Sequence, residues 1–167
     1  MDARICEASD FGSVRHVLEQ AFHRPSEADL VDALRQNGHL TLALSAEVGG
    51  RVVGFVGFSP VEVRSEGRRI PAQGLAPLAV HPDFQRTGIG SALVRAGLEA
   101  TFKHGNDIVV VLGSPEFYGR FGFENAARRG ILWEHGGSEA FQVIGRAADA
   151  FDGVTGFVSY GPEFAGV

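Results

Sequence analysis

The feature that most constrains this chain is a strand, a glycine-rich turn, a helix and a second strand in close succession. Residues 74–80 are apolar enough for a buried strand, and residues 108–112 are the run Ile-Val-Val-Val-Leu. Between them lies the turn Gln85-Arg86-Thr87-Gly88-Ile89-Gly90, after which apolar residues recur at helical spacing: Ile89, Leu93, Ala96 and Ala100. Such a crossover is right-handed, so the two strands are expected to be parallel neighbours or near-neighbours in an α/β fold with a mixed sheet.

The glycine-rich turn is suited to binding a diphosphate. A helix N-terminus carries N–H groups without intrahelical partners and a partial positive charge, which attract phosphate oxygens when the preceding loop lets the backbone come close. Gly88 and Gly90 lack the Cβ atoms that would obstruct this approach, and the Arg86 side chain adds charge. The candidate donors are the N–H groups of Arg86, Gly88, Ile89, Gly90 and Ser91. A turn made only for strand–helix packing is the alternative.

The segments before this unit are expected to form two helices and a hairpin. The helices are predicted at residues 10–22 and 25–36, with Ser9 or Asp10 capping the first and Asn37-Gly38 ending the second. Strands at residues 40–44 and 52–58 flank Gly49-Gly50, a pair able to take the positive φ angles of a tight hairpin turn.

Later segments add short strands without marking a new domain. Strands are predicted at residues 123–126, 141–144 and 156–160, and Pro77, which has no N–H, indicates a bulge or a free edge in its strand. Since there is no linker, repeat or low-complexity tract, one domain spanning residues 1–167 is expected.

Composition argues against several classes of protein. Cys6 is the only cysteine, which excludes an intrachain disulfide and a thiolate metal cage, and the six histidines lack metal-ligand spacing. The net charge is −5 and no Lys/Arg cluster is interleaved with aromatics, so nucleic acid is not an expected partner. No run approaches the ~20 apolar residues of a membrane span, and the start lacks the apolar run of a signal peptide. A soluble, cytoplasmic protein without a metal is therefore expected.

Two segments carry a family resemblance. Residues 78–93 read Leu-Ala-Val-His-Pro-Asp-Phe-Gln-Arg-Thr-Gly-Ile-Gly-Ser-Ala-Leu, and residues 117–123 read Phe-Tyr-Gly-Arg-Phe-Gly-Phe. The first closely resembles the acetyl-CoA-binding segment of the GCN5-related N-acetyltransferases, the GNAT family, and the second resembles that family's tyrosine followed by Gly-Phe. Both occur in the expected order and spacing, within about residues 74–124. The tail at residues 157–164 resembles a bacterial subgroup of predicted acetyltransferases.

The resemblance implies a fold, a reaction and a set of residues. The fold is that of the acyl-CoA N-acyltransferases, with splayed central parallel strands, and the reaction is acetyl transfer from acetyl-CoA to an amine. Tyr118 would be the general acid that protonates the departing thiolate, its alternative being a core aromatic. The pantetheine arm would lie along the strand at Leu78 and Val80, with the Leu78 N–H stabilising the oxyanion. The residues implied in cofactor binding are Leu78, Ala79, Val80, Gln85, Arg86, Thr87, Gly88, Ile89, Gly90, Ser91 and Ser114. Ser114 stands where relatives often carry an asparagine, and its alternative role is a helix cap.

The general base and the acceptor stay open. Residues 73–77 contain no acid where many relatives carry a glutamate, and deprotonation by water is one alternative. The candidate bases, each more often a solvated surface group, are Glu62, Glu66, His39 and Glu116. Cys6 lies far in sequence from both signatures, so the amine of a small molecule or peptide is expected to attack directly. A non-catalytic acyl-CoA-binding or sensing module and an acyltransferase with another acyl-CoA donor are the competing functions. A homodimer through the late strands is a further expectation.

Overall fold

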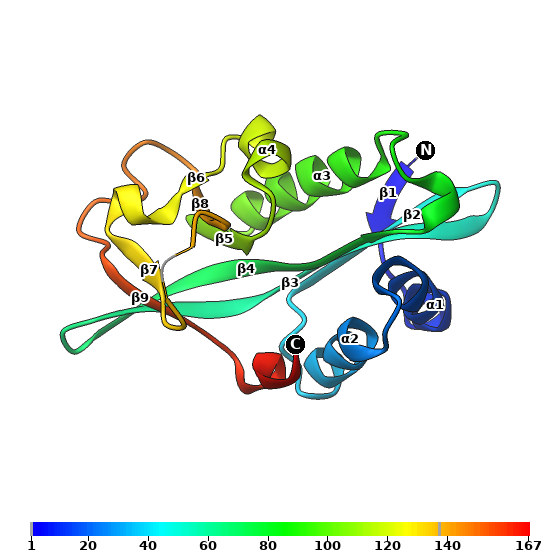
Figure 1. The fold of residues 1–167 in the computed structure, drawn as a ribbon, viewed down its shortest axis with the longest axis horizontal. Coiled ribbons are helices and arrows are strands. Elements are labelled where there is room, and N and C mark those ends of the chain that lie inside the picture. Colours follow the sequence, from blue (N-terminus) through cyan, green and yellow to red (C-terminus); the bar gives the residue numbers. More distant parts are fainter. Residues whose placement is uncertain (1, 137) are drawn as a thin grey trace. The chain divides into compact units, whose positions relative to one another are not determined.

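The computed structural model describes residues 2–136 and 138–167 and shows helices packed on a mixed sheet (Figure 1). Within these residues the α-helices are α1 (Phe11–Phe22), α2 (Ser26–Gln36), α3 (Ile89–Lys103) and α4 (Pro115–Tyr118). The strands are β1 (Asp2–Ile5), β2 (Leu42–Val48), β3 (Arg51–Ser65), β4 (Arg68–Val80), β5 (Ile108–Leu112), β6 (Glu124–Asn125), β7 (Ile131–Trp133), β8 (Phe141–Gly145) and β9 (Gly156–Tyr160). Short 3-10 turns are η1 (Ala8–Asp10), η2 (Pro82–Phe84), η3 (Gly119–Phe121), η4 (Ala126–Arg129) and η5 (Pro162–Gly166).

The sheet combines parallel and antiparallel pairs. Its hydrogen-bonded strand order is β1-β2-β3-β4-β5-β8-β6, and β9 pairs with both β3 and β7. β4 and β5 are parallel, with Gln73 opposite Val109 and Gly74 opposite Val110, and β7 and β9 are also parallel. The predicted α/β class with a mixed sheet is confirmed, as is the parallel arrangement of the two strands that flank α3.

The chain divides into two compact units, each with its own core. The first unit comprises residues 2–59, Ala76–Glu99 and Pro162–Val167, and the second comprises Pro60–Leu75 and Ala100–Gly161. Strands β3 and β4 and helix α3 contribute residues to both units.

In the first unit, alternate residues of β3 face different helices, because side chains alternate across a strand. Phe55 packs on one face in a buried cluster with residues of α1, α2 and β4: Val14, Val17, Leu18, Ala28, Val31 and Ala79. On the other face, a Cβ atom at Gly54 would lie 2.9 Å from both Ile89 and Leu93 of α3. Strand β3 therefore lies between the α1–α2 pair and α3, as Figure 1 shows.

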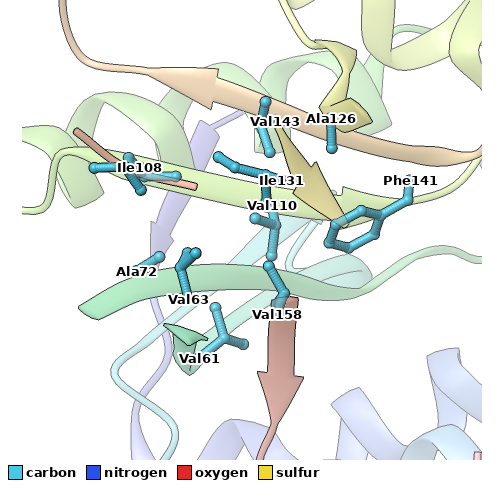
Figure 2. Close-up of a cluster of buried hydrophobic side chains, with 11 residues drawn as sticks. Val61, Val63, Ala72, Ile108, Val110, Ala126, Ile131, Phe141, Val143 and Val158 are labelled. Carbon is cyan, nitrogen blue, oxygen red and sulfur yellow. The ribbon is translucent and has the colours of Figure 1, made fainter. Parts of the chain in front are cut away.

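The core of the second unit surrounds the apolar strand β5 (Figure 2). Ile108 and Val110 lie in it, and Val109 and Val111 of the same strand are also buried, as expected of a strand covered on both faces. The other buried members are Val61, Val63, Ala72, Ala126, Ile131, Phe141, Val143, Val154 and Val158. Trp133 stacks on Phe141 with 6.3 Å between ring centroids, so it packs against this core.

The predicted hairpin is present, and its second strand is longer than expected. Val48 of β2 pairs with Arg51 of β3, and the two residues between them, Gly49 and Gly50, have φ angles of 59° and 78°. Positive φ at both central positions matches the type I′ turn. Strand β3 continues beyond Phe58 to Ser65 because residues 61–64 pair with β9.

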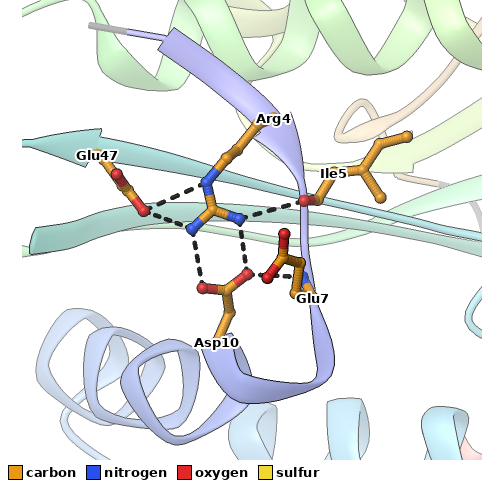
Figure 3. Close-up of polar contacts among 5 residues, drawn as sticks. All are labelled: Arg4, Ile5, Glu7, Asp10 and Glu47. Atoms are coloured by element: carbon orange, nitrogen blue, oxygen red, sulfur yellow. Dashed lines mark hydrogen bonds and ion pairs between the residues drawn. The ribbon is translucent and has the colours of Figure 1, made fainter. Parts of the chain in front are cut away.

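The N-terminal residues form a strand that the sequence did not predict. Arg4 of β1 donates to Asp10 at 2.7 and 2.9 Å and forms an ion pair with Glu47 of β2 (Figure 3). Asp10 also accepts from the backbone N–H of Glu7 at 2.6 Å. Of the two predicted capping residues, Ser9 and Asp10, it is Asp10 that stands at the N-cap position of α1. Its side chain makes no cap hydrogen bond to α1, because its carboxylate is taken by Arg4 and by the start of η1.

Candidate active site

The turn at Arg86–Gly88, between β4 and α3, contains the positive φ angles of an anion-binding nest. Arg86 has a φ of 62° and Gly88 a φ of 89°, and they flank Thr87, which has no positive φ. A turn with left-handed residues can direct successive N–H groups toward one concave surface. Residues 85–88 are exposed, so these groups are accessible from solvent.

Two side chains of the turn are used to hold its shape. The Gln85 amide donates to the Val80 carbonyl at 3.0 Å, and the Thr87 hydroxyl donates to the Phe84 carbonyl at 2.6 Å. Because both side chains are occupied within the turn, a phosphate would be met at Gln85 and Thr87 mainly by backbone groups.

Helix α3 begins with its first turn directed at this loop. The N–H of Ala92 donates to the Gly88 carbonyl at 3.0 Å, which places the N–H groups of Ile89 and Gly90 ahead of the helical hydrogen-bond ladder. Ile89 is buried and anchors the helix start against Gly54. A Cβ at Gly88 would meet no other atom within 4 Å, so glycine is needed there for its positive φ and not for packing within the protein.

The end of β4 has one buried and one partly exposed face. Ala79 packs in the α1–α2 cluster, whereas Leu78 and Val80, on the other face, are half-buried. Pro77 lies within the strand after a cis peptide bond. The Leu78 and Val80 N–H groups remain predictions as ligands of the pantetheine arm.

Tyr118 is the last residue of the short helix α4 and is held by aromatic neighbours. Its ring makes edge contacts with Phe117 and Phe123, at centroid distances of 4.9 and 5.6 Å, and a Cβ at Gly113 would lie 2.5 Å from it. The residue is 8% exposed, and this burial raises the pKa of the Tyr118 phenol to about 12. The hydroxyl therefore keeps its proton at neutral pH.

A second tyrosine in the same unit was not singled out from the sequence. The Tyr160 ring would lie 3.0 Å from a Cβ at Gly74, and burial followed by the proximity of Tyr118 raises the pKa of the Tyr160 phenol. In the sequence, Tyr160 lies in the strand predicted at residues 156–160 and in the tail at residues 157–164 that carries the subgroup resemblance, and neither pattern assigns it a chemical role.

Ser114 has the structural role that was its alternative. Its hydroxyl accepts from the Phe117 N–H at 3.3 Å and caps α4. This cap positions Tyr118 at the end of the same helix, while a contact of Ser114 with the cofactor remains a prediction.

The candidate bases differ sharply in their surroundings. Glu62 is paired with Arg64 at 3.4 Å, and Glu66 and Glu116 are exposed. His39 contacts the buried carboxylate of Glu163 at 2.6 Å. His39 is thus the one candidate of the four with a buried ionic partner among the described residues.

The predicted residues fall into two groups. Residues 78–80 and 85–91 lie together in the first unit, and Ser114 and Tyr118 lie together in the second. Within residues 2–136 and 138–167 no group of three metal-ligating side chains occurs. In that same part of the chain, none of the helices has the length and apolar character needed to cross a membrane.

Comparison with known proteins identifies the class of protein to which this chain belongs. The family described as acetyltransferase (GNAT) domain matches residues 2–126, so the class is that of the acetyltransferases. The chain belongs to the GNAT family, which confirms the resemblance found in its two signature segments.

Among its relatives is YhbS of Escherichia coli K12, named as an uncharacterised N-acetyltransferase, with 42% identity over 157 residues covering 93% of each chain. A crystal structure of E. coli YhbS in complex with CoA has a TM-score of 0.92 at 40% identity and covers 98% of this chain and 91% of that one. A GNAT acetyltransferase of Brucella melitensis in complex with acetyl-CoA has a TM-score of 0.81 at 33% identity, with coverage of 98% and 97%. These neighbours confirm the acyl-CoA N-acyltransferase fold.

Proposed function

We propose that this protein transfers the acetyl group of acetyl-CoA to a primary amine of a small molecule or peptide by direct attack. The observation that carries the proposal is the nest at Arg86–Gly88 followed at once by the start of α3. Main-chain donors and a helix N-terminus suit a diphosphate, and CoA contains one. Two similar proteins that contain CoA or acetyl-CoA support this choice of donor.

The nest and the end of β4 would bind different parts of the cofactor. The N–H groups of residues 86–91 would bind the diphosphate, with Arg86 adding a charge that its exposed position leaves free to reorient. The half-buried segment Leu78–Val80 would accept the pantetheine arm along its backbone, as an added strand does. The Leu78 N–H would then stabilise the oxyanion of the tetrahedral intermediate.

Tyr118 would act as the general acid. A phenol whose pKa is raised to about 12 stays protonated at neutral pH, so it has a proton to give when the carbon–sulfur bond breaks. The short helix capped by Ser114 and the aromatic contacts around the ring keep the hydroxyl in a fixed place.

Attack by the amine needs no covalent enzyme intermediate. The one cysteine, Cys6, is a weak nucleophile here, because burial raises the pKa of its thiol to about 11. The amine nitrogen would therefore attack the thioester carbon itself.

The test is CoA release from acetyl-CoA by the purified protein with a panel of primary amines. Tyr118→Phe should lower kcat by about 10²-fold, the scale of one general acid, while CoA binding measured by calorimetry stays within about threefold. Tyr160→Phe is the matched control, since it removes a buried hydroxyl from the same unit and should lose far less activity. Binding of CoA without turnover by the wild-type protein with any amine would favour a sensing module, and turnover only with a longer acyl-CoA would favour another donor.

A further inference from the structure

Glu163 is a buried carboxylate in the first unit whose partners come from the end of α2. Its side chain is 2% exposed, and its Oε2 atom accepts from the Asn37 amide at 2.9 Å and contacts His39 Nδ1 at 2.6 Å. Its other oxygen, Oε1, is buried and has no hydrogen-bond partner among the described residues. A buried charge with an unused oxygen is costly and is seldom kept without a use.

The ionised Glu163 carboxylate determines which ring nitrogen of His39 carries the proton. Burial by itself raises the pKa of the Glu163 carboxyl, but hydrogen bonds from Asn37, from its own backbone N–H and from His39 outweigh burial and lower that pKa. An ionised carboxylate can only accept, so Nδ1 of His39 must be the donor. The lone pair of the neutral imidazole then lies on Nε2, and the His39 side chain is 49% exposed.

The backbone holds His39 in one place. Gly38 has a φ of 70°, its N–H donates to the Arg35 carbonyl at 3.1 Å, and the His39 N–H donates to the Leu34 carbonyl at 2.8 Å. These two bonds form a Schellman motif, which closes the end of α2. Beyond it, both the N–H and the hydroxyl of Thr41 donate to the Phe58 carbonyl of β3 at 2.9 Å. The main chain is thus held in place on both sides of His39.

Leu40, the residue after His39, lies close to the part of β4 that leads to Leu78. A Cβ at Gly57 would lie 3.2 Å from Cδ1 of Leu40 and 3.1 Å from the carbonyl oxygen of Ala76. The Leu40 side chain and the Ala76 carbonyl of β4 therefore both lie close to Gly57, and Ala76 is two residues before Leu78.

Glu163 of η5 contacts the imidazole. Helix α2 carries Glu27, Asp29, Asp32 and Arg35. Glu27 is paired with Arg24, Asp29 and Asp32 are paired with Arg15, and the Arg35 guanidinium lies over the Phe11 ring at 3.6 Å.

We propose that His39, oriented by Glu163, removes the proton from the acceptor ammonium. His39 Nε2 takes one proton, and the lone pair released on nitrogen attacks the thioester carbon. A carbon–nitrogen bond forms and the carbon–sulfur bond breaks. The thiolate takes the proton that Tyr118 donates in the proposed function, and the second proton that the nitrogen loses on becoming an amide returns to Tyr118 through solvent. His39 is the catalytic residue and Glu163 a positioning residue. This inference rests on the proposed function.

The test compares His39→Gln with His104→Gln. His104 is an exposed histidine whose Nδ1 contacts a backbone carbonyl, that of Ala100 at 2.6 Å, so it matches His39 without the carboxylate. His39→Gln should lower kcat/KM near neutral pH by about 10²-fold and remove the ascending limb that the imidazole gives to the pH–rate profile, whereas His104→Gln should leave both unchanged. The deficit of His39→Gln should shrink as pH rises and the amine becomes neutral in solution.

A further measurement does not depend on activity, and a second variant adds to it. Nitrogen-15 NMR of the wild-type protein should show His39 as the Nδ1–H tautomer, and Glu163→Gln should change that signal and lower kcat with little change in KM. An Nε2–H tautomer, or a His39→Gln protein with the wild-type pH profile, would overturn the inference and leave the proposed function intact. Wild-type protein that binds CoA but acetylates no amine would overturn the proposed function, and this inference with it.

Discussion

The Asp10 carboxylate connects strand β1 with turn η1 and makes the stability of the folded protein depend on pH. Hydrogen bonds from the Arg4 side chain and the Glu7 backbone N–H lower the pKa of the Asp10 carboxyl from 3.8 to about 2. The unfolded chain therefore takes up this proton at a higher pH than the folded protein does. The stability contributed by the charged form is complete above pH 3.8 and is lost as pH falls toward about 2.

Asp10→Asn should abolish this part of the acid sensitivity. We expect the midpoint of urea unfolding of the wild-type protein to fall more steeply than that of the variant as pH is lowered from about 4 to about 2. At pH 7 the variant should be the less stable of the two. Parallel pH curves for the two proteins would mean that the Arg4–Asp10 pair does not contribute to stability.

At Gly97 the absence of a side chain allows helix α3 to pack closely on Phe58 of strand β3. A Cβ there would lie 2.5 Å from the Phe58 ring, whose side chain is fully buried and cannot easily move. Overpacking of this kind costs about 1–3 kcal/mol, more than the ~1 kcal/mol that alanine gains over glycine in a helix. Gly97→Ala should therefore lower the free energy of unfolding.

Gly12→Ala is the matched control for Gly97→Ala. Gly12 is also helical, but a Cβ there would meet no other atom within 4 Å, so only the helix propensity changes. Chemical unfolding should show a gain of up to about 1 kcal/mol for Gly12→Ala and a loss for Gly97→Ala. A gain at both positions would contradict the close approach of α3 to β3.

Among the helices and strands, those with a strong local sequence pattern were predicted correctly, whereas strand segments that depend on pairing with another strand were missed. Helix α3 contains all four residues predicted at helical spacing and strand β5 has the predicted bounds, because helical spacing and a continuous apolar run are local signals. Strand β1 was missed because its residues Asp2–Ile5 are partly or fully exposed and only its pairing with β2 makes it a strand. Pairing with β9 likewise extends β3 past Pro60, where local propensity ends a strand.

The candidate site shows the same division. The turn at residues 85–91 and Tyr118 could be found from sequence because each lies within a short signature. The contact between His39 and Glu163 could not, since 124 positions separate the two residues and no local pattern links them. Cofactor roles for residues 78–80, 85–91 and 114 and the acid role of Tyr118 remain predictions that binding and kinetics must test.

At the scale of the molecule, the two units share three elements of the chain. Because β3, β4 and α3 each pass from one unit into the other, neither unit can lose its structure without interrupting elements of the other. We propose that the chain is one folding domain. Calorimetry should show one unfolding transition whose van't Hoff and calorimetric enthalpies agree, and two separate transitions would contradict this.

The central claim is that the turn at residues 85–91 binds the diphosphate of CoA, and isothermal titration calorimetry tests it most directly. The wild-type protein should bind both CoA and acetyl-CoA. Gly88→Ala should weaken binding by roughly tenfold, because a φ of 89° is strained for alanine and the nest would be less populated, whereas Gly12→Ala should bind as the wild type does. No heat with either ligand, or equal affinity in wild-type and Gly88→Ala proteins that are both folded, would contradict the account.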